Sequence, residues 1–164
     1  IRRFVRYEGP CVAYIHAGGT HGVLVKFETS DEVFAKPEFE AYGKDVAMQV
    51  AAANPTYLCK ADVAPEVLEK EKEILMQQAI NEGKPANIAE KMVMGRIAKF
   101  YKENCLLDQA FVKDDKQSIT DYTKATAKEL GGDIKVVAFT RFEKGEGLEK
   151  KEDNFAEEIA SMTK

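Results

Sequence analysis

The first part of the chain alternates apolar and polar positions in short runs that are typical of β-strands. Three segments are rich in Val, Ile, Phe and Tyr, and glycine-containing turns separate them; they are residues 1–7, 11–16 and 22–27. Short runs of this kind, bounded by turn residues, are typical of an antiparallel meander. We therefore expect three strands before residue 30.

The apolar period then changes to that of an amphipathic helix. One helix face is predicted by apolar residues three or four positions apart, namely Phe39, Tyr42, Val46 and Val50. The helix is expected to end at Asn54-Pro55, because the residue before a proline is pushed out of the helical region.

Two further helical stretches, separated by a break at residues 83–85, predict a helical hairpin. Asp62 is expected to cap the first helix, and Pro65 is tolerated in its first turn. Apolar positions recur in this helix at heptad-like spacing, namely Val67, Leu68, Ile74 and Leu75. Gly95 in the second helix costs about 1 kcal/mol relative to Ala, which favours a close backbone approach there. Helices joined by so short a turn must lie antiparallel.

The C-terminal part predicts a helix, a strand and a last helix. Residues 118–130 have a helical pattern that Gly131 would end, and residues 134–142 alternate as a strand does. The last helix carries Phe155 and Ile159 on one face. This order predicts an α+β fold, in which a small antiparallel sheet is packed with helices and an antiparallel helical hairpin is inserted.

We expect three units along the chain. A core α+β subdomain comprises residues 1–62 and 104–150, the inserted helical hairpin comprises residues 63–103, and a C-terminal helical module comprises residues 151–164. A two-helix arm cannot bury both of its faces alone, so some of its residues should meet a partner or the neighbouring helix.

Composition narrows the class of protein. The 164 residues are 45% hydrophobic and 32% charged, with a net charge of −4 and mixed signs throughout, so no basic face for nucleic acid is implied. No apolar run approaches the roughly 20 residues that a membrane span needs. Three widely spaced cysteines without a C-x-x-C pair indicate reduced thiols in a cytoplasmic protein.

The polar residues form no catalytic or cofactor-binding constellation. His16 and His21 flank a glycine-rich turn, but no carboxylate or thiolate stands at a diagnostic metal-ligand spacing, so a structural turn with one exposed histidine is favoured. Gly83-Lys84 lacks both the upstream glycine and the following Ser or Thr of a phosphate-binding loop. No serine lies in a nucleophile elbow. We therefore expect a non-enzymatic chain with no cofactor and no metal.

Longer strings carry more information than any single residue. The string EGKPANIAEKMVMGRIAKFYKENCLLDQAFVKDD occupies residues 82–115, AMQVAAANP occupies residues 47–55, and RFEKGEGLEKKEDNFAEEI occupies residues 141–159. In this order, over nearly the whole chain, they resemble elongation factor Ts, the nucleotide-exchange factor for elongation factor Tu. The resemblance implies a cytoplasmic translation factor for protein biosynthesis, which binds elongation factor Tu and promotes release of GDP.

The resemblance also implies which parts of the family are missing here. The N-terminal helical docking domain has no counterpart in these residues. Neither does the Thr-Asp-Phe-Val motif, whose aspartate and phenylalanine form a wedge near the magnesium site of elongation factor Tu.

The resemblance assigns partner contacts to particular positions. His16, in the string YIHAGG, and Val112 and Lys113, which follow Phe111, match positions that contact the third domain of elongation factor Tu. Phe155 and Ile159 match the module that contacts its GTPase domain. For Phe111 and Phe155, ordinary core packing is the competing interpretation.

The hairpin leaves a second function open. The family calls this region the dimerisation domain, so a homodimer through the hairpin is an expectation. Its stripe, Val67, Leu68, Ile74 and Leu75, would pack within the chain or against a second copy. The alternative function is a non-enzymatic structural or oligomerisation module that uses the hairpin as its interface.

Overall fold

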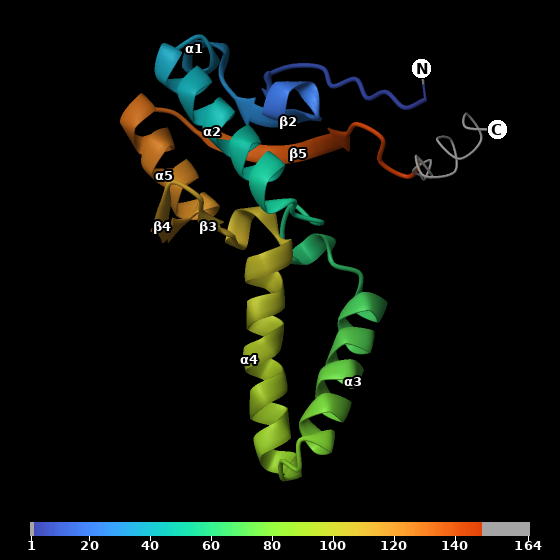
Figure 1. Cartoon of the computed structure of the whole chain (residues 1–164). Helices are drawn as coiled ribbons and strands as arrows, with labels where there is room; N and C mark the ends of the chain where they lie inside the picture. The colour runs from blue at the N-terminus through green and yellow to red at the C-terminus, as the bar shows by residue number, and fades with distance from the viewer. Residues whose placement is uncertain (1, 149–164) are drawn as a thin grey trace, which may run out of the picture.

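The computed structural model of this chain consists of a small α+β body from which two long helices project (Figure 1). It describes residues 2–148, so the expected last helix, with Phe155 and Ile159, lies outside the described residues. The body contains a three-stranded antiparallel sheet of β1 (Cys11–His16), β2 (His21–Thr29) and β5 (Ile134–Glu143). The expected α+β class, with a small antiparallel sheet, is confirmed.

Residues 2–7 form no strand, so the strand predicted there from the sequence is wrong. The central strand β2 already pairs with β1 on one side and β5 on the other. The N-terminal segment is held to β5 and the following turn by side chains instead. The Tyr7 hydroxyl lies 2.7 Å from Thr140 Oγ1, and Arg3 pairs with Glu146 at 2.7 Å.

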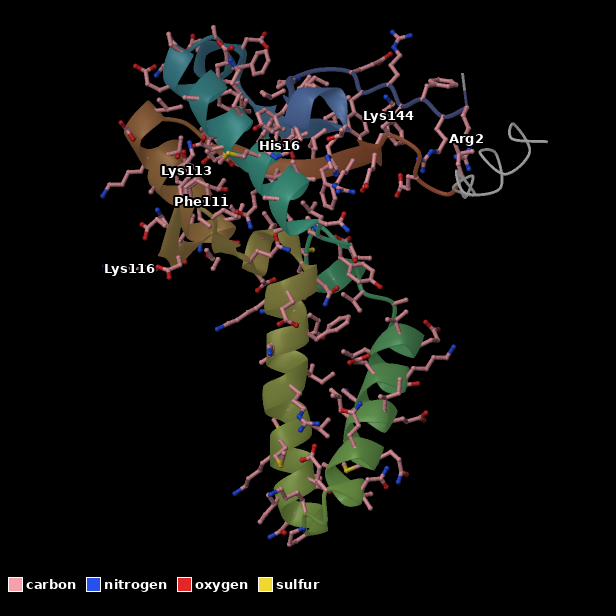
Figure 2. The ribbon with its side chains drawn as sticks, in the orientation of Figure 1. Arg2, His16, Phe111, Lys113, Lys116 and Lys144 are labelled. Atoms are coloured by element: carbon pink, nitrogen blue, oxygen red, sulfur yellow. The ribbon has the colours of Figure 1, made fainter. Side chains whose placement is uncertain are left out.

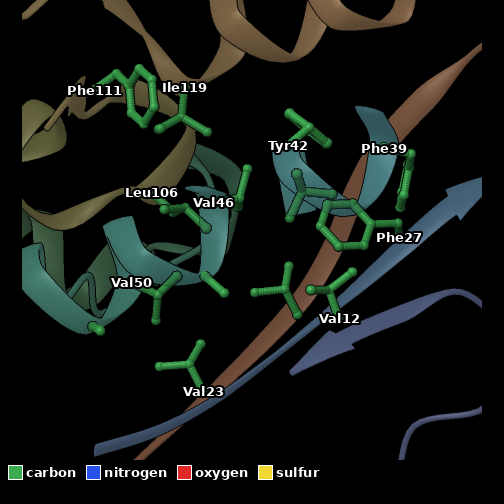
Figure 3. Close-up of a cluster of buried hydrophobic side chains, with 14 of the residues drawn as sticks. Val12, Val23, Phe27, Phe39, Tyr42, Val46, Val50, Leu106, Phe111 and Ile119 are labelled. Carbon is green, nitrogen blue, oxygen red and sulfur yellow. The ribbon is translucent and has the colours of Figure 1, made fainter. Parts of the chain in front are cut away.

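The core lies between helix α2 (Pro37–Ala53) and one face of the sheet (Figure 3). A short helix, α1 (Asp31–Phe34), precedes α2, and α5 (Ile119–Leu130) packs beside it. Side chains that are less than 2% exposed include Phe27, Phe39, Tyr42, Val46, Val50, Leu106 and Ile119. The Phe27 and Phe39 rings meet edge to face, with centroids 5.2 Å apart.

The expected ends of α2 and α5 are confirmed. Asn54, at φ 45°, ends α2 immediately before Pro55. Ser118 caps the start of α5 by accepting a hydrogen bond from Asp121 N, and Gly131, at φ 70°, ends that helix. Local sequence therefore sets where these two helices begin and end.

The arm consists of α3 (Pro65–Asn81) and α4 (Ala86–Asn104), which are close at the turn between them and diverge toward the body (Figure 1). Asp62 does not cap α3, whose N-cap is Ala64. The Asp62 carboxylate instead accepts a hydrogen bond from Cys59 N at 2.9 Å and closes the short 3-10 turn Lys60–Asp62. Two residues of non-helical chain then separate this turn from α3.

The predicted apolar stripe of the arm has two different environments. Leu68 and Leu75 are half-buried between the helices. Val67 and Ile74 are exposed, at 38% and 53%. The side chains that are buried between the two helices are Ala79 of α3 and Ala89, Val93 and Ile97 of α4. The arm therefore has an apolar seam and, outside it, exposed apolar side chains.

The arm joins the body at a narrow neck. The amides of Thr56 and Tyr57 both donate to the carbonyl of Asn104 at 3.0 Å, and Leu106 N donates to Tyr57 O at 2.9 Å. Cys105 is fully buried here, and burial together with the Asp108 carboxylate raises the pKa of its thiol to about 11. After the neck, the chain forms the 3-10 turn Leu106–Asp108 and a small hairpin of β3 (Ala110–Phe111) and β4 (Asp114–Ser118).

Gly95 and Gly43, both inside long helices, offer a matched test of packing. A Cβ placed on Gly95 meets no atom within 4 Å, so the expected close approach there is wrong. Gly95→Ala should therefore raise the free energy of unfolding of the arm by about 1 kcal/mol, because it removes the backbone-entropy cost of glycine. Circular dichroism during thermal unfolding measures this effect.

Gly43→Ala is the control. Its Cβ would lie 2.5 Å from Val12 Cγ2 in the core, so this variant should be destabilised by about 1–3 kcal/mol. Destabilisation by the Gly95 substitution would contradict the open packing of α4.

Candidate partner-binding site

The described residues contain no recognisable metal centre. Between residues 2 and 148, no cluster of three or more His, Cys, Asp or Glu side chains could hold a metal ion. Over the same residues, no helix combines the length and the apolar character that crossing a membrane requires. The candidate site is therefore the set of residues that the sequence predicted for partner contact.

Phe111, Val112 and Lys113 follow one another at the turn between β3 and β4 but have different environments. Figure 2 shows Phe111 and Lys113 on this turn. Phe111 is only 4% exposed, belongs to the core and stacks on Tyr122 with ring centroids 4.5 Å apart. Lys113 Nζ lies 2.6 Å from Asp45 Oδ1. Val112 is 49% exposed. The structure favours the packing interpretation for Phe111 and leaves Val112 as the apolar side chain that a partner can reach.

Asp45 of α2 contacts Lys113 and also Tyr122, the residue on which Phe111 stacks. Its second oxygen accepts a hydrogen bond from the Tyr122 hydroxyl at 3.0 Å, while its first pairs with Lys113. Burial and the Asp45 carboxylate raise the pKa of Tyr122 well above its usual range, so the hydroxyl remains a donor. Lys113 is thus an anchor of the turn as well as a charged residue at its surface.

His16 belongs to a separate group at the ends of the strands β1, β2 and β5. Its Nδ1 lies 3.0 Å from the Tyr14 hydroxyl. His21, which faces it across the strand pair, is held at both nitrogens, by Thr20 Oγ1 at 2.9 Å and by Glu143 at 3.4 Å. Within residues 2–148, His16 Nε2 makes no hydrogen bond. Of the two histidines, His16 has a ring nitrogen available to a partner.

The structure does not bring all the predicted contact residues together. His16 is at the end of β1, whereas Phe111 and Lys113 are at the β3–β4 turn (Figure 2). A partner that touches both regions must therefore contact both the end of β1 and the β3–β4 turn. Phe155 and Ile159 lie outside the described residues, so their place in this arrangement stays a prediction.

The arm carries an apolar groove of about 550 Å³ on one side of its seam. It is lined by Leu68, Lys72, Met76, Glu90, Val93, Met94, Ile97 and Tyr101. Met94 is 74% exposed. On another side, polar and charged residues dominate, and Arg96 pairs with Glu82 at 3.3 Å. The spacing of apolar residues alone did not predict this apolar groove of the arm.

Sequence reasoning missed three residues that hold the β3–β4 turn: Asp45, Gln49 and Tyr122. Asp45 and Tyr122 gave no signal, since both are ordinary surface residues for a helix. Gln49 did give one, because a glutamine stands on the apolar face between Val46 and Val50. A polar residue at a core position of an amphipathic helix indicates a buried hydrogen-bonding partner elsewhere in the chain.

Comparison with known proteins identifies the family. The family model described as "Elongation factor TS" matches residues 1–146. Elongation factor Ts of Clostridium perfringens (strain SM101 / Type A) is 53% identical over 167 residues, which cover 99% of this chain and 54% of the relative. The protein of that name from Clostridium kluyveri (strain NBRC 12016) is 54% identical over 162 residues, or 97% and 52% of the two chains. The chain thus spans about half the length of these relatives, and it belongs to the elongation factor Ts family.

Proposed function

We propose that this chain is the elongation factor Tu-binding part of a guanine-nucleotide exchange factor, and that the complete protein promotes release of GDP from elongation factor Tu. Family membership supports the class of function. The single structural observation that supports this part's role is the exposed side chain of Val112. Its two neighbours in the sequence are held by other elements, Phe111 by Tyr122 and Lys113 by Asp45. His16, with one ring nitrogen available, is the proposed polar contact, and Lys113 is a second, charged one.

Exchange of this kind needs no catalytic side chain. A factor that binds the nucleotide-free partner more tightly than the loaded partner must weaken nucleotide affinity by the same ratio. Contacts that are equal in both states of the partner contribute affinity but do not shift the nucleotide equilibrium. The residues proposed here are remote docking contacts, and the sequence contains no Thr-Asp-Phe-Val motif to act at the magnesium site.

A second candidate function is self-association through the arm. The apolar groove between α3 and α4, with Met94 exposed beside half-buried Leu68, supports it. Val67 and Ile74 add apolar surface outside the groove. A second copy could cover these side chains, and the proposed homodimer would then coexist with binding of elongation factor Tu by the body.

The first function predicts binding without exchange. The chain should bind elongation factor Tu, while release of labelled GDP stays near its spontaneous rate at concentrations that saturate binding. Val112→Asp should weaken binding about tenfold, because it places a charge in an apolar contact. Calorimetry and GDP-release kinetics measure the two quantities.

Ile88→Asp is the matched control, since Ile88 is 46% exposed but lies on the arm. The affinity of this variant for elongation factor Tu should equal that of the unsubstituted chain. Fast, saturable release of GDP by this chain alone would contradict the proposed division of roles. Absence of binding would remove the function itself.

The second function predicts a concentration-dependent dimer in sedimentation velocity. Met94→Glu should lower the dimer fraction without lowering the melting temperature, because Met94 is 74% exposed in the single chain. Lys91→Glu, which changes an exposed residue of the same helix outside the groove, is the control. A chain that stays monomeric at all concentrations would eliminate this candidate.

A further inference from the structure

Gln49 is a buried polar residue whose role lies beyond the helix that carries it. It is 1% exposed, and its neighbours on the same face of α2, Val46 and Val50, are fully buried. A primary amide offers two N–H donors and one acceptor oxygen, and burying them without partners is costly. The hydrogen-bond partners of this amide therefore indicate its structural role.

All three hydrogen bonds of the Gln49 side chain go to the β3 segment. Its Nε2 donates to Gln109 Oε1 and to the carbonyl of Ala110, each at 3.1 Å. Its Oε1 accepts from the backbone amide of Val112 at 2.8 Å. The amide thus holds the backbone on both sides of Phe111.

We propose that Gln49 is a positioning residue that fixes the β3–β4 turn and so presents Val112 to the partner. This role rests on the proposed function, in which Val112 contacts elongation factor Tu. The turn has little support of its own, because β3 has only two residues and its register with β4 shifts between Ala110 and Phe111. Gln49 supplies hydrogen bonds that the short ladder does not.

Two side-chain anchors complete the arrangement. The Phe111 ring stacks on Tyr122, and Lys113 pairs with Asp45. With the backbone held by Gln49, Phe111 packed in the core and the Lys113 ammonium held by Asp45, Val112 is the exposed apolar side chain of the three. A contact that is held in its bound geometry before association loses less conformational entropy on binding.

The competing explanation is that Gln49 contributes only to the stability of the core. A double-mutant cycle separates the two roles, because a residue that acts through Val112 loses its effect on binding when Val112 is removed. Gln49→Met keeps the length of the side chain and removes all three hydrogen bonds. Val112→Ala removes the docking side chain.

In the full chain, Gln49→Met should weaken binding of elongation factor Tu about tenfold when Val112 is present, and less than about twofold in the Val112→Ala background. Amide exchange followed by NMR gives a readout that does not depend on the partner. Exchange of the Val112 amide should accelerate at least about tenfold, while that of Leu106, bonded to Tyr57 O, stays unchanged.

Equal losses of affinity in both backgrounds, or unchanged exchange at Val112, would overturn the proposal. If the chain does not bind elongation factor Tu at all, the proposed function fails, and exchange at Val112 still decides whether Gln49 positions the turn. A through-hydrogen-bond coupling between Val112 N and Gln49 Cδ tests the contact in the unsubstituted chain. Absence of that coupling would overturn the proposal even if Gln49→Met fails to fold.

Discussion

The packing of α2 against the sheet is the interaction on which the rest of the body depends. One face of α2 places Phe39, Tyr42 and Val46 in the core against β1 and β2. The Tyr42 hydroxyl lies 2.8 Å from Thr123 Oγ1, which connects α2 to α5 inside that core. Asp45 and Gln49, one turn apart on the same helix, hold the β3–β4 turn. A shift of α2 would therefore move both the core and Val112, the proposed docking residue.

The arm, although it is long, has few contacts with the body. Among the described residues, none of α3 or α4 belongs to the core cluster of the body. The connection between arm and body includes the backbone hydrogen bonds around Asn104 and Tyr57 and the Gln109 side chain, whose Nε2 donates to the carbonyl of Glu103 at 2.8 Å. The proposed docking surface on the body and the apolar groove on the arm can therefore serve different partners. The division into a core subdomain and an inserted hairpin stays a prediction until the two parts are separated.

Local signals predicted more of this fold than of its site. The ends of α2 and α5 followed from Asn54-Pro55 and Gly131, because proline and left-handed glycine act through neighbouring backbone. The prediction of a strand at residues 2–7 was wrong. The apolar pattern of a segment does not show which strand pairs with β2, and β5 takes that place. Val112 was found only by resemblance. Gln49 forms hydrogen bonds with residues 60 to 63 positions away in the sequence. The apolar period of a helix predicts which face is buried but not which distant residues it contacts.

Replacing residues 63–103 with a short Gly/Ser linker tests the central claim, that α2 and the sheet form a self-sufficient body that carries the docking turn. The replacement keeps Asn104, whose carbonyl accepts hydrogen bonds from Thr56 and Tyr57. We predict one cooperative unfolding transition and an affinity for elongation factor Tu within about twofold of the full chain. Loss of cooperative unfolding, or loss of binding by a variant that still folds, would contradict it.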